Sequence, residues 1–207
     1  IGPENVYVMC DVQTSSANQV TCLTRPMPES FNEGADQEVL VATKIVEEAK
    51  CKNPGTCVFR YSAAATPTVT SLGGITSLEP GQSFAITGTG FTSDTTVSIN
   101  GISCTVSSPS STSLEVQVPT NFIPVKDGVI VVNVPGKGHA KFEEVSNTID
   151  VKIVVSNISP TSGPSSGVLL TITGKGFHHS STVTVGGTSC RVRSVTPTQI
   201  KCHATTF

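Results

Sequence analysis

The sequence has no tryptophan, only two tyrosines, and charged residues at 14% of its 207 positions. So few aromatic side chains argue against a flat platform on which sugars could stack. A net charge of −2 argues against a broad electrostatic contact with nucleic acid, which needs a basic face. No run approaches the roughly 20 apolar residues of a membrane span, and no signal peptide opens the chain. We therefore expect a soluble segment, of the kind that is cut from a larger protein.

Catalytic patterns are missing as well. No Ser/His/Asp order and no G-x-S-x-G elbow is present. The carboxylates fall in different predicted turns and strands, where nothing pairs them as acid and base, and they show no D-x-D clustering for calcium (Asp94, Asp127, Glu143, Glu144 and Asp150). We predict that the chain is not an enzyme and holds no cofactor and no metal.

The main positive feature is an internal repeat. Residues 84–91 read Phe-Ala-Ile-Thr-Gly-Thr-Gly-Phe, and residues 170–177 read Leu-Thr-Ile-Thr-Gly-Lys-Gly-Phe. The same offset of 86 carries Cys104 onto Cys190. Alternating apolar and small polar residues indicate strands with one buried face. A repeat of this length indicates an array of similar domain-sized modules.

Two glycines end the first of these strands. At Gly88 and Gly90 we expect a bulge or a close backbone approach that a side chain would block, with Phe91 as an apolar anchor beyond the bend. The pair lacks the third glycine and the following helix of a dinucleotide site. The glycines therefore predict a structural feature and no cofactor.

Composition and pattern predict an all-β fold, because charge is low and Val, Thr, Ser, Gly and Pro are abundant. In the first part of the chain we expect strands at 38–42 and 57–61, although 35–50 also admits a short helix. Further on, strands are expected near 68–72, 83–90, 95–107, 113–118, 128–134 and 142–154, with a hairpin tip at 137–139.

Six of the seven cysteines form spacing pairs. Twelve positions separate Cys10 from Cys22 and Cys190 from Cys202, and Cys51 and Cys57 enclose the turn sequence Lys-Asn-Pro-Gly-Thr. We predict these three pairs as disulfides, and therefore an extracellular location. Metal binding is the alternative, but the sequence has no C-x₂-C pair, and its histidines lack zinc-site spacing (His178, His179 and His203).

The seventh cysteine has no partner at this spacing. Twelve residues after Cys104 the chain has Val116, so the middle module has lost one half of the bridge. We expect a buried free thiol that acts as a small hydrophobic side chain. A disulfide to another chain is the alternative.

Aligning the modules by their cysteines predicts three segments. Residues 1–66 correspond to the C-terminal part of a module, 67–155 to a complete module, and 156–207 to the N-terminal part of another. Pro67 favours an extended entry into the second segment. The linker to the third is very short, which limits the angle between neighbours and suggests a semi-rigid rod.

Motifs in the last two segments resemble the IPT/TIG immunoglobulin-like domain. They are Ile158-Ser-Pro-x-x-Gly163, the glycine motif of residues 170–177, Cys190, and Ile200-x-Cys202. The resemblance implies tandem immunoglobulin-like β-sandwiches, one complete and flanked by partial modules. Val116 in place of cysteine, and Gly73-Gly74 where the family has Ser-Pro, depart from the pattern.

The first segment adds a second resemblance. Cys51-x₅-Cys57-x-Phe59-x-Tyr61, leading into Thr66-Pro67, is similar to module ends in the fibrocystin family. This implies a non-catalytic stretch of a large receptor-like surface protein, a spacer and adhesion rod on cilia, stereocilia or another cell surface. Its partners would be extracellular proteins or neighbouring repeats, with no nucleic acid, and its membrane anchor would lie outside this chain.

Other functions remain open. IPT repeats also form stalks or ligand-binding modules in plexin-like signalling receptors, but the Cys51–Cys57 pair favours the first reading. An accessory domain of a secreted carbohydrate-active enzyme would need aromatic residues that are absent. A DNA-binding domain of the Rel type fits poorly with the acidic balance and the cysteine pairs. Asn157, in Asn-Ile-Ser, is the only glycosylation sequon, and we expect poor use of it because it should lie in a paired strand.

Overall fold

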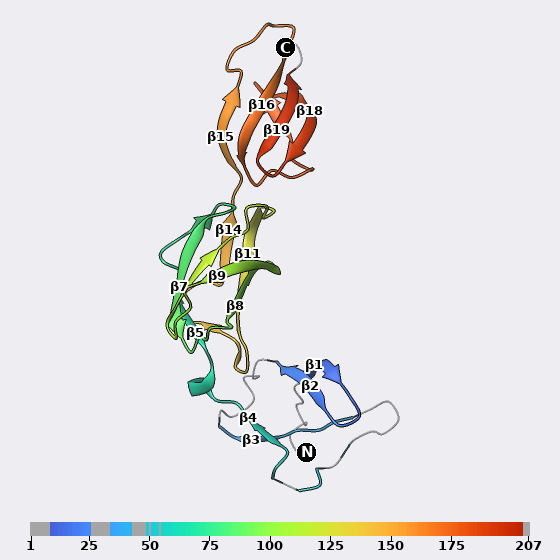
Figure 1. The fold of residues 1–207 in the computed structure, drawn as a ribbon, viewed down its shortest axis with the longest axis vertical. Coiled ribbons are helices and arrows are strands. Elements are labelled where there is room, and N and C mark those ends of the chain that lie inside the picture. The colour runs from blue at the N-terminus through green and yellow to red at the C-terminus, as the bar shows by residue number, and fades with distance from the viewer. Residues whose placement is uncertain (1–8, 26–33, 43–48, 50, 54, 205–207) are drawn as a thin grey trace, which may run out of the picture. The chain divides into compact units, whose positions relative to one another are not determined.

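A computed structural model describes residues 9–25, 34–42, 49, 51–53 and 55–204. The chain forms two compact units, Ile1–Thr66 and Pro67–Phe207, which are described separately below. The described residues are nearly all strand, turn or loop, with one short 3₁₀ helix, η1 (Ala63–Ala65). The fold is therefore all-β, as the composition predicts (Figure 1).

The first unit consists of two antiparallel ribbons. One pairs β1 (Cys10–Ser15) with β2 (Val20–Thr24), and the other pairs β3 (Asp36–Glu38) with β4 (Val58–Arg60). None of the described apolar side chains in this unit is buried.

The expected strand at 38–42 was largely wrong. β3 ends at Glu38, a single backbone hydrogen bond from the Val39 N–H to the Cys57 carbonyl follows it, and Val41 forms an isolated bridge with Ala49. The described residues between 35 and 42 contain no helix, and part of the alternative helix over 35–50 lies outside the described residues. The closing strand expected at 57–61 is confirmed as β4.

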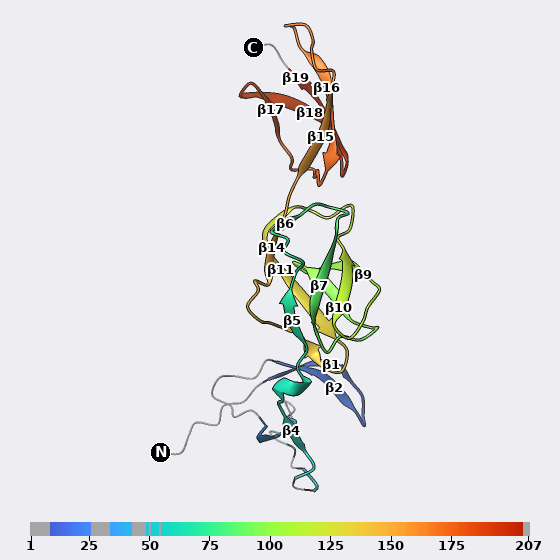
Figure 2. The same ribbon diagram turned by 90° about the vertical axis from the view of Figure 1, so that its left-hand side faces the viewer.

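The second unit begins with a complete module, whose strands follow one continuous hydrogen-bonded path (Figure 2). The path runs β13-β5-β7-β10-β9-β8-β11-β14-β6, and β12 pairs with β11. Its strands are β5 (Thr68–Ser71), β6 (Ser77–Leu78), β7 (Ser83–Thr89), β8 (Thr96–Ile99), β9 (Ile102–Ser107), β10 (Ser113–Gln117), β11 (Val125–Val134), β12 (Gly138–His139), β13 (Lys141–Phe142) and β14 (Thr148–Val151).

Along most of these strands every second residue is apolar and buried, and these side chains form the core of the middle module. In β7 the pattern buries Phe84, Ile86 and Gly88 and leaves the residues between them facing outward. The neighbouring strand β10 buries Leu114 and Val116. In all, 17 buried side chains form one cluster. A single contiguous cluster of this kind is the core expected of one β-sandwich domain.

Two expected strands of this module are split. Residues 95–107 form the hairpin β8–β9, because Asn100 and Gly101 both take positive φ (50° and 79°), as in a type I′ turn. Residues 142–154 are not one strand: they contain the end of β13, all of β14 and the first residue of the next module. The chain leaves the extended conformation just after β13, where Glu144 takes a positive φ of 56°. The expected hairpin tip is confirmed, with Val134 paired to Gly138.

The last module is a five-stranded sheet in the order β15-β16-β19-β18-β17. Its strand β15 begins two residues before the boundary expected at 155/156. The core is smaller and contains Leu170, Ile172, Phe177, Cys190, Ile200 and Cys202. The strands are β15 (Val154–Ser159), β16 (Val168–Lys175), β17 (Val183–Val185), β18 (Thr188–Thr196) and β19 (Gln199–Ala204).

Candidate functional site

The three predicted disulfides are present. Cys10–Cys22 joins β1 to β2 and Cys190–Cys202 joins β18 to β19, and the Cα atoms are 5.6 Å apart in both. Cys51–Cys57 closes the short loop before β4, at a Cα separation of 5.9 Å. The equal separations agree with one bridge geometry in repeat-equivalent hairpins.

Cys104 is free and only half-buried on β9. Burial raises the pKa of its thiol to about 11, so the thiol is protonated at neutral pH. A protonated thiol is a poor nucleophile and a poor metal ligand. Cys104 therefore resembles a small packing residue more than a reactive one.

The remaining titratable side chains that the structure describes do not gather into a common site. Among the described residues, no three His, Cys, Asp or Glu side chains could hold a metal ion. The rings of His178 and His179 lie 3.7 Å apart at their centroids, and His178 Nδ1 contacts Ser180 Oγ at 3.2 Å. Asp150 Oδ1 accepts a hydrogen bond from the Asp127 backbone N–H, at the irregularity in the pairing of β11 with β14. These arrangements offer no acid–base pair on a reacting group.

Asn157 lies on β15 opposite Thr173, as expected for a paired strand, and its side chain is exposed. Its use as a glycosylation acceptor stays a prediction.

The feature that residues of both modules build together is the junction within the second unit. β14 ends at Val151 and β15 begins at Val154. Lys152 donates its backbone N–H to the Leu78 carbonyl at 2.8 Å, which fixes it to the middle module. Val154 pairs with Lys175 in the last module. Ile153 is thus the single residue between two anchored positions.

Contacts across the junction come from the repeated glycine motif. Lys175 Nζ lies 3.4 Å from Glu79 Oε2, with both side chains about half exposed. The next residue, Gly176, has a φ of +77°, and a Cβ placed on it would lie 2.7 Å from Pro124 Cγ and 3.2 Å from Pro80 Cγ. The absence of a side chain at Gly176 therefore lets the two modules approach.

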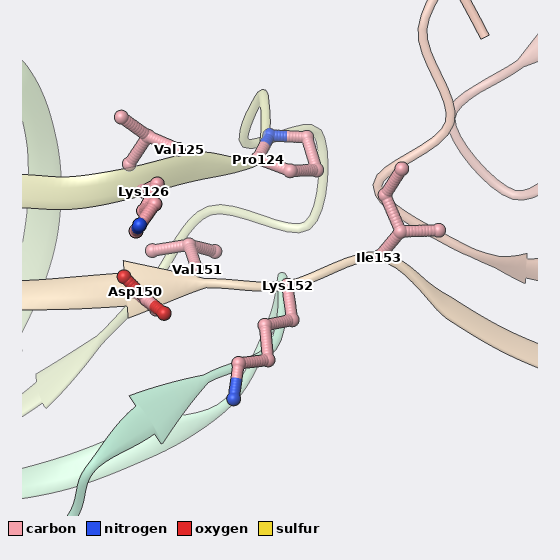
Figure 3. A pocket seen from close by; sticks show the side chains of 7 residues that line it. All are labelled: Pro124, Val125, Lys126, Asp150, Val151, Lys152 and Ile153. Carbon is pink, nitrogen blue, oxygen red and sulfur yellow. The ribbon is translucent and has the colours of Figure 1, made fainter.

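Two shallow depressions flank the linker. The larger, about 510 Å³, is lined by Pro124, Val125, Lys126, Asp150, Val151, Lys152 and Ile153 (Figure 3). In that view Ile153 projects beyond the end of β14. The smaller, about 310 Å³, includes Pro124, Ile153, Gly176 and His178. Both depressions are open, and the larger one exposes more apolar than polar surface, which suits packing between proteins better than enclosure of a small substrate.

Sequence reasoning found the short linker but missed the partners around it. Glu79 and Lys175 are 96 positions apart, and no motif contains both. The only sequence signal at this point is Gly176, the second glycine of the repeated motif. Its equivalent Gly90 packs on Pro67 of its own module, so the contact differs between the two copies.

Comparison with known families agrees with this architecture. The profile of the IPT/TIG domain matches residues 67–148 and 154–207. The chain belongs to the IPT/TIG domain family. The two matches fall on the complete module and on the five-stranded sheet that follows it, and the five residues between them contain the linker.

A search of curated protein sequences found no match. Among solved structures, the plexin A4 full extracellular region is 16% identical, with a TM-score of 0.35 over 96% of this chain and 17% of that one. Surface glycan-binding proteins are also similar. The SGBP-B of Bacteroides ovatus, solved with a mixed-linkage heptasaccharide, is 15% identical (TM-score 0.32, 78% of this chain, 49% of that one). PbSGBP-B of Prevotella bryantii is 14% identical (TM-score 0.36, 69% and 37%).

The chain thus spans less than half the length of each of these proteins. At such low identity, these likenesses give no information on what this chain binds. No helix among the described residues is long and apolar enough to cross a membrane.

Proposed function

We propose that this chain is a non-catalytic extracellular segment of a receptor-like surface protein, in which IPT/TIG modules act as spacers and adhesion surfaces. An extracellular location is supported by the three disulfides, which form and persist in oxidising compartments. A binding role is supported by the junction, whose open apolar surface suits protein contacts and whose polar groups form no catalytic arrangement.

The observation that carries this proposal is the single free residue between the modules. A linker of one residue, anchored by a backbone hydrogen bond on one side and by strand pairing on the other, gives little freedom of rotation. The Glu79–Lys175 pair contributes little by itself, because both groups are half exposed. Stiffness would come mainly from chain geometry and from the fit of Gly176 against the two prolines.

Finer features of the proposal rest on the resemblance to the fibrocystin family. The Cys51–Cys57 loop, followed by Phe59 and Tyr61 on and after β4, is the feature that supports it. On this basis the segment would belong to a ciliary or stereociliary surface coat, with extracellular proteins or neighbouring repeats as partners.

An insertion tests the spacer role. A Gly/Ser stretch placed between Lys152 and Ile153 should broaden the distribution of lengths in small-angle scattering, while the melting temperature stays nearly constant. The same insertion at Gly136, in the β11–β12 turn, is the matched control and should change neither quantity. An unchanged length distribution would mean that the junction is already a free hinge, and the spacer proposal would then be wrong.

A further inference from the structure

The last module carries a positive charge that the rest of the chain does not. Residues 154–204 contain four basic side chains and no Asp or Glu, so their formal net charge is +4. All 15 acidic residues lie elsewhere, together with the other nine basic ones, which gives the remainder of the chain a net charge of −6. The whole-chain value of −2 therefore conceals a separation of charge. The four cations of the last module are Lys175, Arg191, Arg193 and Lys201.

Two of these cations lie on the outer side of the β18–β19 hairpin. In β19, Ile200 and Cys202 are buried in the core, so Lys201 between them faces the opposite way. In β18, Arg191 follows the buried Cys190 and is itself exposed. Both charged side chains therefore stand on the side of the sheet that faces away from the core.

Arg193 joins them at an irregularity in the strand pairing. β18 shifts its register against β19 between Val192 and Ser194, which leaves Arg193 unpaired beside Lys201. Val192 packs against the core and Arg193 is exposed, so the Arg193 side chain also points outward. Neighbouring strands lie about 5 Å apart and alternate residues of one strand about 7 Å apart, so the three cations form one cluster. We call Arg191, Arg193 and Lys201 the basic face.

The charges of the basic face are not neutralised within the described part of the chain. The module contains no Asp or Glu, and none of the four ion pairs that the described residues form involves a residue of the basic face. Lys175 differs, because it pairs with Glu79 at the junction. Like charges held this close repel one another, and an anion that contacts all three would remove that repulsion.

The complete middle module shows that this side of the sheet faces solvent in the fold. The residues at the three equivalent positions are exposed there as well, namely Thr105, Ser107 and Glu115. Exposure of the basic face is therefore a general property of the module. Its charge is not, since the same positions of the middle module carry two hydroxyls and one carboxylate.

The surroundings of the basic face favour a polysaccharide over a protein or a nucleic acid. Protein interfaces depend on aromatic and other apolar anchors, and single-stranded nucleic acid stacks its bases on aromatic rings. None of the described residues on the outer side of β16, β18 and β19 is Phe, Tyr or Trp. Leu169 is the one large apolar side chain there, and Thr171 places a hydroxyl opposite Lys201. A hydrated polyanion needs only such cations and hydrogen-bonding groups.

We propose that the basic face binds a sulfated polysaccharide. Each arginine offers a planar fork of N–H donors that can contact two oxygens of one anionic group, and Lys201 adds a compact charge. The Thr171 hydroxyl can bond to the sugar hydroxyls between sulfate groups. This inference rests on the extracellular location proposed above, because sulfated polysaccharides occur on cell surfaces and in the matrix. It gives the adhesion role a partner of defined chemistry.

Binding of a fluorescent heparin oligosaccharide to the full chain, followed by fluorescence anisotropy, tests this. The affinity of the wild type should fall about 20-fold between about 50 and about 200 mM salt, because three cationic contacts release nearly as many counterions. The double variant Arg191→Gln, Lys201→Gln should weaken binding about tenfold at the lower salt concentration and reduce the salt dependence to about one third. A wild-type chain that does not bind heparin at about 50 mM salt would overturn the proposal.

The matched control is the double variant Lys126→Gln, Lys152→Gln. Both lysines are exposed, lie outside the last module's sheet, and carry the same total charge as the pair removed from the basic face. This control should leave heparin binding unchanged. An equal loss in the two double variants would show that binding follows the net charge alone, and the basic face would then not be a site. Circular dichroism checks that each variant is folded.

Two competitors identify the class of partner. Uncharged dextran should not displace the heparin probe, and single-stranded DNA with the same number of charges should displace it less well than heparin itself. Displacement by dextran, or DNA that binds as tightly as heparin, would overturn the assignment to a sulfated polysaccharide. The location is tested separately by a thiol count on chain secreted from a eukaryotic host. More than the single free thiol of Cys104 would contradict the proposed extracellular function and leave the heparin result unaffected.

Discussion

The carbonyl oxygen of Thr68 occupies the space that a Cβ atom on Gly88 would need. The tip of the Phe91 ring closes the same space from the other side, with Cζ 2.7 Å from that Cβ position. In the last module the Val154 carbonyl and Phe177 Cζ stand in the same relation to Gly174. The first glycine of the repeated motif is thus required by a close approach of the preceding strand.

Gly88→Ala should therefore destabilise the middle module by about 3 kcal/mol, since either β5 or the Phe91 ring must move. Urea unfolding followed by circular dichroism measures the loss. Gly136→Ala is the control, because nothing lies near its Cβ position; its positive φ, which Gly88 does not share, should cost about 1 kcal/mol. Equal losses in the two variants would show that the crowding at Gly88 is relieved without cost.

The sequence predicted this motif well because its cause is local. Two glycines and a phenylalanine at fixed spacing, repeated once, indicate a close approach in both modules. The Asn100-Gly101 turn was also present in the sequence. Apolar and polar residues alternate both before and after it, so residues 95–107 were predicted as one strand although they form a hairpin. Contacts between Glu79 and Lys175 could not be predicted, because they depend on how two folded modules meet.

Val116→Cys should restore the bridge that the middle module lacks. Val116 pairs with Val106 as Cys202 pairs with Val192, and Cys104 lies opposite Val97 as Cys190 lies opposite Val183. A new disulfide should raise the free energy of unfolding by about 2–4 kcal/mol over the same variant carrying Cys104→Ala. A thiol count in denaturant should fall to zero for the single variant, and two remaining free thiols would contradict the prediction.

Cys104 should react slowly in the folded protein. Because burial raises the pKa of its thiol from 9.0 to about 11, the thiolate fraction at pH 8 falls about a hundredfold. Alkylation by iodoacetamide, followed by mass spectrometry, should be slow in buffer and fast in denaturant. Fast alkylation of folded protein would instead favour the alternative that Cys104 is available for a disulfide to another chain.

The same pKa shift predicts a dependence of stability on pH. The folded state holds the Cys104 proton more tightly than the unfolded state, so stability should fall as pH rises from about 9 toward 11. Below pH 9 the thiol is protonated in both the folded and the unfolded state, so Cys104 causes no change of stability with pH there. Melting temperatures of the wild type and of Cys104→Ala should therefore diverge only above pH 9. Parallel curves would mean that the thiol is solvated in the folded state.

Asn157 is predicted to be glycosylated poorly, although its side chain is exposed, because β15 pairs it with Thr173 and Pro160 follows the sequon. The intact mass of protein secreted from a eukaryotic host measures occupancy, and Asn157→Gln supplies the unmodified reference. Full occupancy would show that β15 pairs only after the chain has passed the glycosylation machinery.

Gly176→Ala should affect the junction more than the modules. The alanine Cβ would lie 2.7 Å from Pro124 Cγ, a contact that the modules can relieve by moving apart, whereas the overlap at Gly88 lies inside one sandwich. The positive φ of Gly176 adds a local cost of about 1 kcal/mol. We therefore expect a small loss of stability together with a wider distribution of lengths in small-angle scattering. Gly90→Ala has a similar φ but meets Pro67 of its own module, so it should lower stability without changing that distribution. If both variants leave the distribution unchanged, the fit of Gly176 against the prolines does not hold the junction, and its stiffness comes from the short linker alone.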